Sequence, residues 1–418
     1  MMHSAVHPLQ IRPRGSNHVG MRQYNERVVL HAIRLHGDLP KADLARLTHL
    51  STQTVSLIVN KLLDDQLLIK CAPLRGRIGQ PSVPIALNPD GAFAIGIKIG
   101  RRSMDVLLID FTGNVRQRFE RSYAFPDPRV LFDDLQAMVS EVVAFMQHIH
   151  ADAADRLTGV GVAAPLSLGG WQALLDVPAE QAQAWNEMDL YSRIQALPAV
   201  RTLDLPVHLL KDTAAACTAE LVAGRGHRLK SFLYLFVDTF IGGGLVIDSH
   251  VHSGTSGNAG AVGSMPLHAA QPTGPAPAQV LSQASLLNLQ RLFSAAGLVV
   301  EAALDERALQ APWLALTERW LGEAAQAIAL SIANAACLLD LEHVILDGVF
   351  NRALLAELIA HTQKALDAHS WEGVTRPTLH AGTIGSDARA LGGALLPLHA
   401  AFAPDPEVFL KTGRPLRR

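Results

Sequence analysis

The stretch from Pro40 to Gln66 constrains the fold of this chain most. It holds a short amphipathic segment, PKADLARLTHL, a break of three or four residues, and a longer amphipathic segment, STQTVSLIVNKLLDDQ. In the longer segment, one apolar stripe at helical spacing is formed by Val55, Ile58, Val59, Leu62 and Leu63. Two helices joined by a tight turn fit this pattern, so the sequence predicts a helix-turn-helix.

The polar face of the longer segment has the side chains that a base-reading helix needs. Ser51 stands just before it, where a serine side chain caps the first free N–H groups of a helix. Opposite the apolar stripe lie short or planar hydrogen-bonding side chains with no acid among them, namely Thr52, Gln53, Ser56 and Asn60. An ordinary surface helix also has a polar outer face, so the segment alone leaves both interpretations open.

The flanking residues extend this motif to a winged helix-turn-helix. Residues 21–37 have apolar side chains at helical spacing and end at a glycine, which predicts a helix packed behind the other two. Further on, LLIKC and VPIALNP predict two short strands joined by a basic loop, the wing. From this loop Arg75 and Arg77 would reach phosphate or the minor groove. The candidate DNA-binding residues are Lys41, Ser51, Thr52, Gln53, Thr54, Ser56, Asn60, Arg75 and Arg77.

Charge is divided unevenly along the chain. Residues 1–80 carry eleven Lys and Arg side chains against five Asp and Glu, a surplus of six positive charges. Because the whole chain has a net charge of −2, the remaining residues carry −8. A basic end on an acidic body indicates that only this end meets a polyanion such as double-stranded DNA, although a solvated charged face gives the same tally.

Length and composition indicate a globular protein with several domains. A chain of 418 residues exceeds what one core usually holds, so two or three domains of about 100–200 residues are expected. No run reaches the about 18–20 apolar residues of a membrane helix, and the N-terminus has no signal-peptide core, so we expect a cytoplasmic protein without a membrane partner. Cys71, Cys217 and Cys337 lie too far apart in sequence for a disulfide framework or a C-x-x-C metal pair.

The N-terminal motif and the residues after it resemble a known family. The order NHVGMRQYNERVVLHAIRLHGDLPKADLARLTHLSTQTVSLIVNKLL, then GRIGQPSVPIALNP and an Ile-Gly-Ile strand, resembles the repressor branch of the ROK family (repressors, open reading frames and sugar kinases). The resemblance extends through nearly the whole chain. One departure is His49, where the family usually has Gly in the turn. A positive φ costs His more than Gly, but His is among the residues that adopt it, so we expect the turn to form.

This resemblance implies an α/β chain with an N-terminal winged helix-turn-helix and a bilobal body of the actin-like, ribonuclease-H-like fold of sugar kinases. Strand and helix signals that alternate in two series agree with two α/β halves. We expect a flexible arm over residues 1–20, the DNA-binding domain over 21–88 and the body over 89–418. Lobe one of the body is expected at about 89–205 with the C-terminal helix, and lobe two at about 206–390.

The expected elements of the body follow from the apolar pattern. The predicted strands are 93–99, 104–110, 113–119, 157–165, 206–211, 232–237, 242–248, 343–348 and one near 378. The predicted helices are 130–148, 213–223, two long segments near 277–296 and 312–339, and a last one that ends near 401.

On the nucleotide side of the expected cleft, the family motifs are altered. In ROK kinases the first strand ends in an Asp-x-Gly-Gly-Thr turn that holds phosphate and metal. This chain has Lys98 in place of the acid and two arginines in place of Gly and Thr, and a lysine there would repel Mg²⁺. In the second loop, Gly-Thr-Gly-x-Gly-x-Gly, two glycines are replaced by Asp238 and Phe240. In the third loop, usually Gly-Gly in the family, this chain has Asp347-Gly348. We therefore expect no phosphoryl transfer and no cofactor.

On the sugar side, the resemblance places Asp212 at the family's catalytic Asp, and the usual Asn neighbour is Lys211 here. Asp212 also stands just before a predicted helix, so a helix cap alone and a cap that also binds ligand remain open. The family's Ala-Gly-Glu-x-Gly-His segment has Ala261 in place of the sugar-binding Glu and Ser264 in place of the zinc-binding His. The cysteine cluster that follows in the family is absent, so we expect no metal site.

Two tryptophans follow the strand that ends in AAPL, where family members place loops near the sugar. Aromatic rings stack on sugar faces, but they are also common core fillers. We expect Trp171 at the rim of the cleft and Trp185 in the core. The candidate effector-binding residues are Asp212, Lys211, Trp171 and Asn258.

These observations favour a sequence-specific DNA-binding transcriptional regulator, a repressor of carbohydrate-related genes, that acts as a homodimer or homotetramer on a palindromic operator. A catalytically inactive kinase-like body would sense a sugar-type effector and change its lobe arrangement. The alternative is a ROK-type sugar kinase that phosphorylates a sugar hydroxyl with ATP, which Asp212 supports and Lys98 opposes. A third interpretation keeps the DNA binding and makes the body a ligand-free scaffold for partners.

Overall fold

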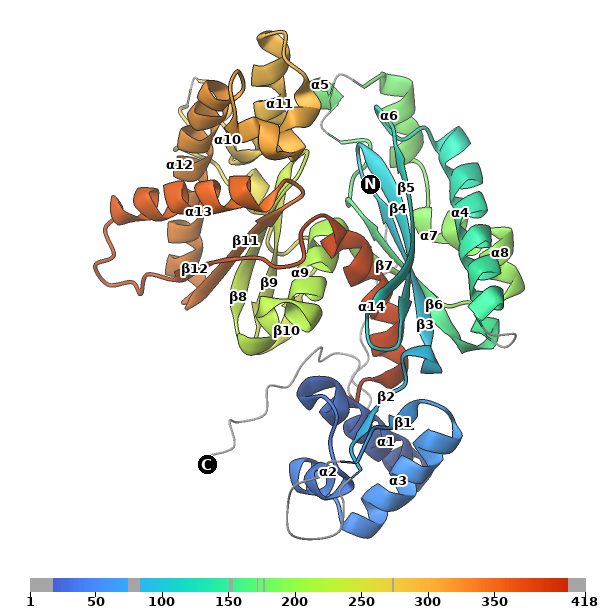
Figure 1. Cartoon of the computed structure of the whole chain (residues 1–418). Coiled ribbons are helices and arrows are strands. Elements are labelled where there is room, and N and C mark those ends of the chain that lie inside the picture. The colour runs from blue at the N-terminus through green and yellow to red at the C-terminus, as the bar shows by residue number, and fades with distance from the viewer. Residues whose placement is uncertain are drawn as a thin grey trace. The chain divides into compact units, whose positions relative to one another are not determined.

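The computed structural model describes residues 18–73, 83–149, 153–170, 172–175, 177–272 and 274–404. Contacts within the chain define two compact units, whose elements are labelled in Figure 1. Among the described residues, the first comprises those within 18–87 together with 402–404, and the second comprises those within 88–401. Each unit has buried apolar residues of its own and is described separately.

Within its described residues, the first unit contains three helices and a two-stranded hairpin. Its elements are α1 (His18–His36), α2 (Lys41–Thr48), α3 (Thr52–Asp64), β1 (Leu68–Lys70) and β2 (Ile85–Leu87). The two strands pair antiparallel, with Leu68 opposite Leu87. The predicted helix-turn-helix, the helix before it and the hairpin after it are therefore confirmed. The wing tip with Arg75 and Arg77 lies outside the described residues.

The apolar stripe of α3 forms the centre of this unit. The buried side chains of its core include Val29, Ile33, Leu44, Val55, Ile58, Val59 and Leu62. Fully burying one such side chain contributes about 1.5–3 kcal/mol, so the stripe fixes which face of α3 points inward. Leu63, at the end of the predicted stripe, is only half-buried. The opposite face of α3 is left to solvent.

The turns that follow α1 and α2 both begin with left-handed backbone. Gly37 has φ +78° and His49 has φ 56°. Glycine adopts this conformation without a Cβ clash, and His tolerates it better than most side chains. The turn between α2 and α3 thus forms with His49, as the sequence predicts.

The second unit contains a five-stranded sheet in each lobe (Figure 1). The sheet of lobe one has the order β5-β4-β3-β6-β7, in which β3, β6 and β7 pair parallel and the β3–β4 and β4–β5 pairs are antiparallel. Its strands are β3 (Phe93–Ile99), β4 (Ser103–Asp110), β5 (Val115–Ser122), β6 (Leu157–Ala164) and β7 (Val207–Lys211). The helices of this lobe are α4 (Pro128–Ile149), α5 (Gln172–Leu175), α6 (Ala179–Asn186), α7 (Leu190–Gln195) and α8 (Pro198–Thr202).

The sheet of lobe two has the order β10-β9-β8-β11-β12, with β8, β11 and β12 parallel. Its strands are β8 (Phe232–Val237), β9 (Ile241–Ile247), β10 (His250–His252), β11 (His343–Gly348) and β12 (Thr378–Ala381). Its helices are α9 (Asp212–Ala223), α10 (Leu281–Ala284), α11 (Leu286–Ala295), α12 (Leu314–Leu339) and α13 (Arg352–Asp367). Short 3-10 helices of the unit are Pro89–Gly91, Ala153–Arg156, Arg225–Arg228, Val262–Ser264, Val300–Leu304, Glu306–Leu309 and Gly385–Asp387.

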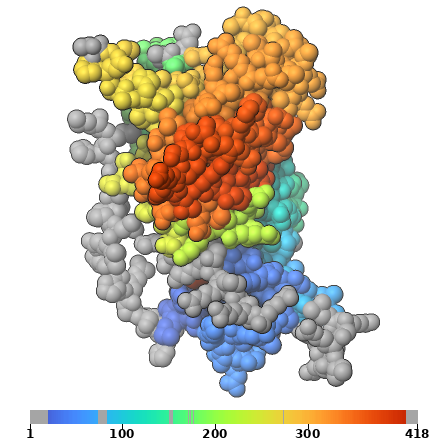
Figure 2. Space-filling view, turned by 90° about the vertical axis from the view of Figure 1, so that its left-hand side faces the viewer, coloured from blue at the N-terminus to red at the C-terminus, as the bar shows by residue number. Residues whose placement is uncertain are grey.

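Three details of the predicted body are wrong. The strand at 206–211 is expected in lobe two, but β7 pairs parallel with β6 in lobe one, and pairing in space cannot be seen in a linear pattern. The segment 277–296 is expected as one helix, but it is interrupted at Ser285 between α10 and α11. No helix is predicted at 352–367, where α13 packs against α12 and forms part of the outer surface of lobe two (Figure 2).

The last helix, α14 (Ala388–Phe402), lies on the sheet of lobe one through close backbone contacts (Figure 1). A Cβ on Gly161 would lie 1.8 Å from the carbonyl oxygen of Gly393, and a Cβ on Gly96 would lie 2.2 Å from that of Ala390. Only glycine allows such an approach. The packing fixes the first turn of α14, and with it the side chain of Arg389, near the end of β3.

Helix α12 is long and apolar enough to cross a membrane when judged by length and composition. However, 56% of its most apolar window is buried in the unit, where Trp320, Ile328 and Ile332 belong to the core of lobe two. The expectation from the sequence concerned uninterrupted apolar runs, and Glu323, Gln326 and Asn334 interrupt α12. Its burial in the core accounts for its composition.

Candidate functional sites

The outward face of α3 carries the predicted base-reading residues. Ser51 caps the helix, because its Oγ accepts a hydrogen bond of 3.1 Å from the backbone N–H of Thr54. The exposed side chains of this face are Ser51, Thr52, Gln53 and Asn60, and Thr54 and Ser56 beside them are half-buried. The helix-turn-helix core therefore presents a polar surface of the kind that enters a major groove.

The fold brings together two of the predicted residues, Lys41 and Asn60. Lys41 Nζ donates a hydrogen bond of 2.9 Å to Asn60 Oδ1 and thereby links the start of α2 to α3. This contact orients the amide of Asn60 and keeps a positive charge at the edge of the reading face. Charges at such an edge contact phosphate and hold a reading helix in register.

An ion-pair network ties the flank of α3 to α1. Lys61 Nζ lies 2.7 Å from a carboxylate oxygen of Asp65 and 3.3 Å from one of Glu26, and Glu26 also pairs with Arg22 at 3.2 Å. The hydrogen bonds to Asp65 and Glu26 raise the pKa of Lys61. Because these pairs are partly or largely exposed, they orient the helices more than they stabilise them.

Leu57 also lies on the reading face, although it is not among the residues predicted to bind DNA. Its side chain is 73% exposed, and it follows Gln53 by one helical turn and precedes Asn60 by three residues. Apolar side chains on a reading helix contact the methyl group of thymine. The signal was present in the sequence, because Leu57 is apolar yet falls outside the stripe that packs inward.

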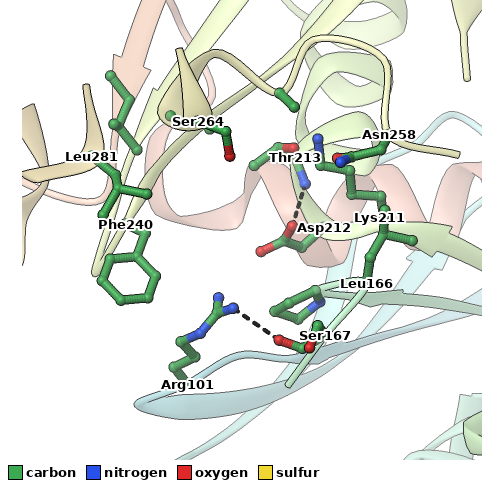
Figure 3. A pocket seen from close by; sticks show the side chains of 15 residues that line it. Arg101, Leu166, Ser167, Lys211, Asp212, Thr213, Phe240, Asn258, Ser264 and Leu281 are labelled. Carbon is green, nitrogen blue, oxygen red and sulfur yellow. Dashed lines mark hydrogen bonds between the residues drawn. The ribbon is translucent and has the colours of Figure 1, made fainter. Parts of the chain in front are cut away.

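In the second unit, a pocket of about 200 Å³ lies between the two lobes (Figure 3). Arg101 and Ser167 come from lobe one, and Lys211 and Asp212 lie where β7 meets α9. From lobe two the polar lining residues include Asn258 and Ser264, and the apolar lining residues include Phe240 and Ala261. We call this space the effector pocket. Three of the predicted effector-binding residues, Lys211, Asp212 and Asn258, line it, and Trp171 lies outside the described residues.

Asp212 presents its carboxylate to the effector pocket (Figure 3). Its Oδ1 accepts a hydrogen bond of 2.8 Å from the backbone N–H of Thr213. Asp212 is the first residue of α9, and Lys211 occupies the N-cap position without a side-chain cap. The predicted N-cap position of Asp212 is therefore wrong by one residue, because the extended backbone of β7 ends at Lys211 and the helix starts directly after it.

Two cationic side chains face the same pocket. Arg101 Nη2 donates to the carbonyl oxygen of Ser167 over 3.0 Å, and its guanidinium lies 4.9 Å from the ring centre of Phe240. The Nε of Arg101 is buried without a hydrogen-bond partner. Lys211 Nζ lies 3.5 Å from the carbonyl oxygen of Gly243. Burial lowers the pKa of Arg101 and of Lys211, and within the described residues neither side chain has an ion-pair partner.

Lys98, Asp105, Asp238 and Arg389 form a second group of charges, which we call the charge cluster. Lys98 contacts the carboxylate of Asp105 and donates to Ser103 Oγ over 2.7 Å. Arg389 pairs with Asp238 in the turn between β8 and β9. Two positive charges therefore meet two negative charges, and the cluster is neutral.

Opposite charges in the charge cluster shift the pKa values of Asp238 and Lys98. Burial opposes ionisation of Asp238, but Arg389 and Lys98 lower its pKa below the ordinary value. Burial, with Arg389 close by, lowers the pKa of Lys98, and Asp105 opposes that shift. Lys98 and Arg389 are each only 4% exposed, so each depends on its acidic partner for favourable electrostatics.

Asp347, in the predicted third loop, is a structural anchor. It is fully buried, and its Oδ1 accepts hydrogen bonds of 2.8 Å from Arg352 Nη1 and from the backbone N–H of Gly348. Its Oδ2 accepts a hydrogen bond of 2.9 Å from the backbone N–H of Gly385. Both oxygens are thus engaged by the protein itself.

No metal-binding group of three or more His, Cys, Asp or Glu side chains occurs within the described ranges. Cys217 is buried, Cys71 is half-buried and Cys337 is exposed, and all three are free thiols.

The sequence model of the ROK family matches residues 94–399, which is most of the chain. The chain belongs to the ROK family. The xylose repressor of Bacillus subtilis (strain 168) is 24% identical over 245 residues, which cover 59% of this chain and 61% of that protein. The DNA-binding transcriptional repressor Mlc of Escherichia coli (strain K12) is 23% identical over 245 residues, or 56% of each chain. This chain thus spans less than two thirds of the length of these curated ROK relatives.

Solved structures of other ROK proteins share the fold. The crystal structure of a ROK family transcriptional regulator, a homologue of the E. coli MLC protein, matches with a TM-score of 0.63 at 21% identity, over 93% of this chain and 98% of that one. A ROK family glucokinase from Streptomyces griseus, in complex with glucose and AMPPNP, matches with a TM-score of 0.55 at 19% identity, over 73% and 99%. The body has the actin-like sugar-kinase fold, and the predicted fold class is confirmed.

Within this ROK body, the residues that the resemblance predicts as departures from the kinase motifs lie either in the effector pocket or in the charge cluster. Phe240, Ala261 and Ser264 line the effector pocket, whereas Lys98 and Asp238 belong to the charge cluster. The sequence alone does not reveal the partners of Lys98 and Asp238. Arg389 lies 151 residues from Asp238 in the chain, so only the folded structure reveals that pair.

The prediction for Trp185 is confirmed. Its Nε1 donates to the carbonyl oxygen of Pro126 over 2.7 Å, and its ring centre lies 6.3 Å from that of Phe132. The indole is buried in the core of lobe one and takes no part in the effector pocket.

Proposed function

We propose that this ROK protein is a sequence-specific DNA-binding transcriptional regulator that represses carbohydrate-related genes. The observation that carries the proposal is the outward face of α3, a capped helix whose apolar stripe is buried and whose Gln53, Leu57 and Asn60 side chains are exposed. Gln53 suits a bidentate contact with adenine and Leu57 suits the methyl group of thymine. The relatives named as repressors support the same assignment.

The body is proposed to sense a sugar-type effector without catalysing phosphoryl transfer. The charge cluster supports this, because Lys98 stands where a metal-binding acid would be needed and is already paired with Asp105. Ligand binding beside Asp212 would shift the equilibrium between lobe arrangements. In this proposal the protein works in the cytoplasm as a homodimer or homotetramer on a palindromic operator.

DNA binding is tested by selecting operators from genomic fragments with the full-length protein and then titrating variants. Gln53→Ala or Leu57→Ala should weaken binding to the selected operator by about 10- to 100-fold, because one base contact contributes about 1–3 kcal/mol. Binding to random DNA should change less than twofold. Gln363→Ala, an exposed position in α13, is the matched control. Equal losses on operator and random DNA would remove Gln53 and Leu57 from base reading, and failure to select any operator would overturn the proposal.

The kinase alternative is tested with ATP, Mg²⁺ and a panel of sugars. We expect the wild-type protein to show no turnover above that of Asp212→Asn. Turnover that Asp212→Asn abolishes would establish the kinase and contradict the proposed non-catalytic body.

A further inference from the structure

The effector pocket carries more positive than negative charge. Among the described residues that line it, the charged side chains are Arg101, Lys211 and Asp212. Two cations against one carboxylate leave a net charge of +1. The other polar side chains that line it, such as those of Ser167, Asn258 and Ser264, are neutral.

This surplus is not cancelled by other parts of the described structure. Arg101 and Lys211 donate only to the carbonyl oxygens of Ser167 and Gly243, which are partial charges. Asp238 and Asp105, the nearby acids, are already paired with Arg389 and Lys98 in the charge cluster. Asp212 attracts Arg101 electrostatically but forms no ion pair with it.

Arg101 is built to receive an anion. Its guanidinium has five N–H donors in a planar fork that matches a carboxylate or a phosphate. One of these donors, Nε–H, is buried without a partner, and another is used by Ser167. The ring of Phe240 restrains the guanidinium by a cation–π contact, so the fork loses little freedom when it binds. In Figure 3 the guanidinium lies on the opposite side of the pocket from Thr213 and Asn258.

We propose that the ligand of the effector pocket is a monosaccharide that carries one negative group, a carboxylate or a phosphate. Arg101 and Lys211 bind the negative group, and Asp212 accepts hydrogen bonds from the sugar hydroxyls. Asn258 and Ser264 supply further polar contacts around the ring. The inference rests on the proposed function only in taking this pocket as the effector site.

The proposal is tested by calorimetry on the full-length protein with matched sugars. Each of D-glucose, D-galactose and D-mannose is compared with its uronate and its 6-phosphate, and inorganic phosphate and acetate serve as ion controls. At least one uronate or 6-phosphate should bind about tenfold or more tightly than its neutral parent, because charge-assisted hydrogen bonds are about twice as strong as neutral ones. This preference should shrink between 50 and 500 mM NaCl. The uronate and the phosphate arms decide which group the pocket takes.

Variants locate the charge that is responsible. Arg101→Gln and Lys211→Asn should each reduce the preference for the charged sugar by about tenfold. Arg102→Gln is the matched control, because Arg102 is exposed and donates to the carbonyl oxygen of Ala124 outside the pocket. Neutral parents that bind as tightly as their charged forms would overturn the inference. So would a preference that survives in both Arg101→Gln and Lys211→Asn, or the absence of binding by every sugar of the panel.

The same samples separate this inference from the proposed function. Operator binding is measured on each protein by electrophoretic mobility shift. A protein that prefers charged sugars but selects no operator would overturn the DNA-binding proposal and retain this inference. A protein that selects an operator and binds only neutral sugars would do the reverse.

Discussion

The charge cluster and the effector pocket lie close together in the same ROK body, yet the protein treats their charges in opposite ways. In the cluster, Arg389 is paired with Asp238 and the net charge is zero. In the pocket, Arg101 and Lys211 keep a surplus positive charge without an ion-pair partner among the described residues. Charges that are neutralised internally contribute to structure, whereas charges left unpaired at a cavity are available to a ligand.

The largest expected effect is on the stability of the cluster. Arg389→Met should lower the free energy of unfolding of the second unit by about 3 kcal/mol, because it leaves Asp238 beside Lys98 without its own cation. The measurement is a urea unfolding curve of the full chain. Arg319→Met, which breaks an exposed pair with Glu323, is the matched control and should cost less than about 0.5 kcal/mol.

A double variant sharpens this result. Asp238→Asn combined with Arg389→Met removes both charges and should recover most of the lost free energy of unfolding. A loss below about 1 kcal/mol in the single variant would show that the pair is not structural.

The next largest effect is on ligand affinity. Asp212→Ala should lower the affinity for the tightest-binding sugar of the panel by about tenfold or more, because a hydrogen bond to a charged group contributes about 1.5–3 kcal/mol. Calorimetry gives the affinity, and Asp248→Ala, an exposed residue paired with Lys230, is the control. Unchanged affinity would mean that the carboxylate of Asp212 only stabilises the start of α9 and does not bind the ligand.

A smaller effect on stability is expected at low pH, where Asp238 of the charge cluster takes up a proton. Arg389 and Lys98 lower the pKa of Asp238 against the opposing effect of burial, so the folded pKa lies below the ordinary value of 3.8. The resulting contribution to stability is present above pH 3.8 and is lost as the pH falls through the folded pKa. The free energy of unfolding of the wild-type protein should therefore fall more steeply below pH 4 than that of Asp238→Asn. Parallel pH profiles would contradict the pairing.

The smallest expected effect completes the comparison. Arg101→Met should change the free energy of unfolding by no more than about 0.5 kcal/mol, because no buried carboxylate loses an ion-pair partner when this charge is removed. The same urea titration checks this value against Arg389→Met. A loss above about 2 kcal/mol would show that Arg101 is structural, and the contrast between cluster and pocket would fail.

The local spacing of apolar residues predicts most of the secondary structure. The stripe through Val55 and Val59 predicted α3 and its inward face, and the apolar run at 93–99 matched β3. The sheet to which β7 belongs could not be predicted, because strand neighbours are set by pairing in space. The helix at 352–367 has an amphipathic pattern that local spacing alone is sufficient to predict.

The candidate site was predicted less completely. Lys211, Asp212 and Asn258 are among the effector-binding residues predicted from the sequence, and they line one pocket. Its chemistry could not be derived from them alone, since it depends on which nearby acids are already paired. The partner of Asp238 is a residue of the last helix, and nothing in the local sequence of either one indicates the other.

The mutual pairing in the charge cluster also limits which single substitutions the protein tolerates at these positions. Replacing Lys98 by an acid would place two carboxylates together with Asp105, and replacing Asp238 by glycine would strand Arg389. Each single step toward a metal-binding kinase turn therefore passes through a less stable protein, and only coordinated substitutions avoid it. Introducing an acidic side chain at position 98 without loss of stability would therefore require several coupled mutations.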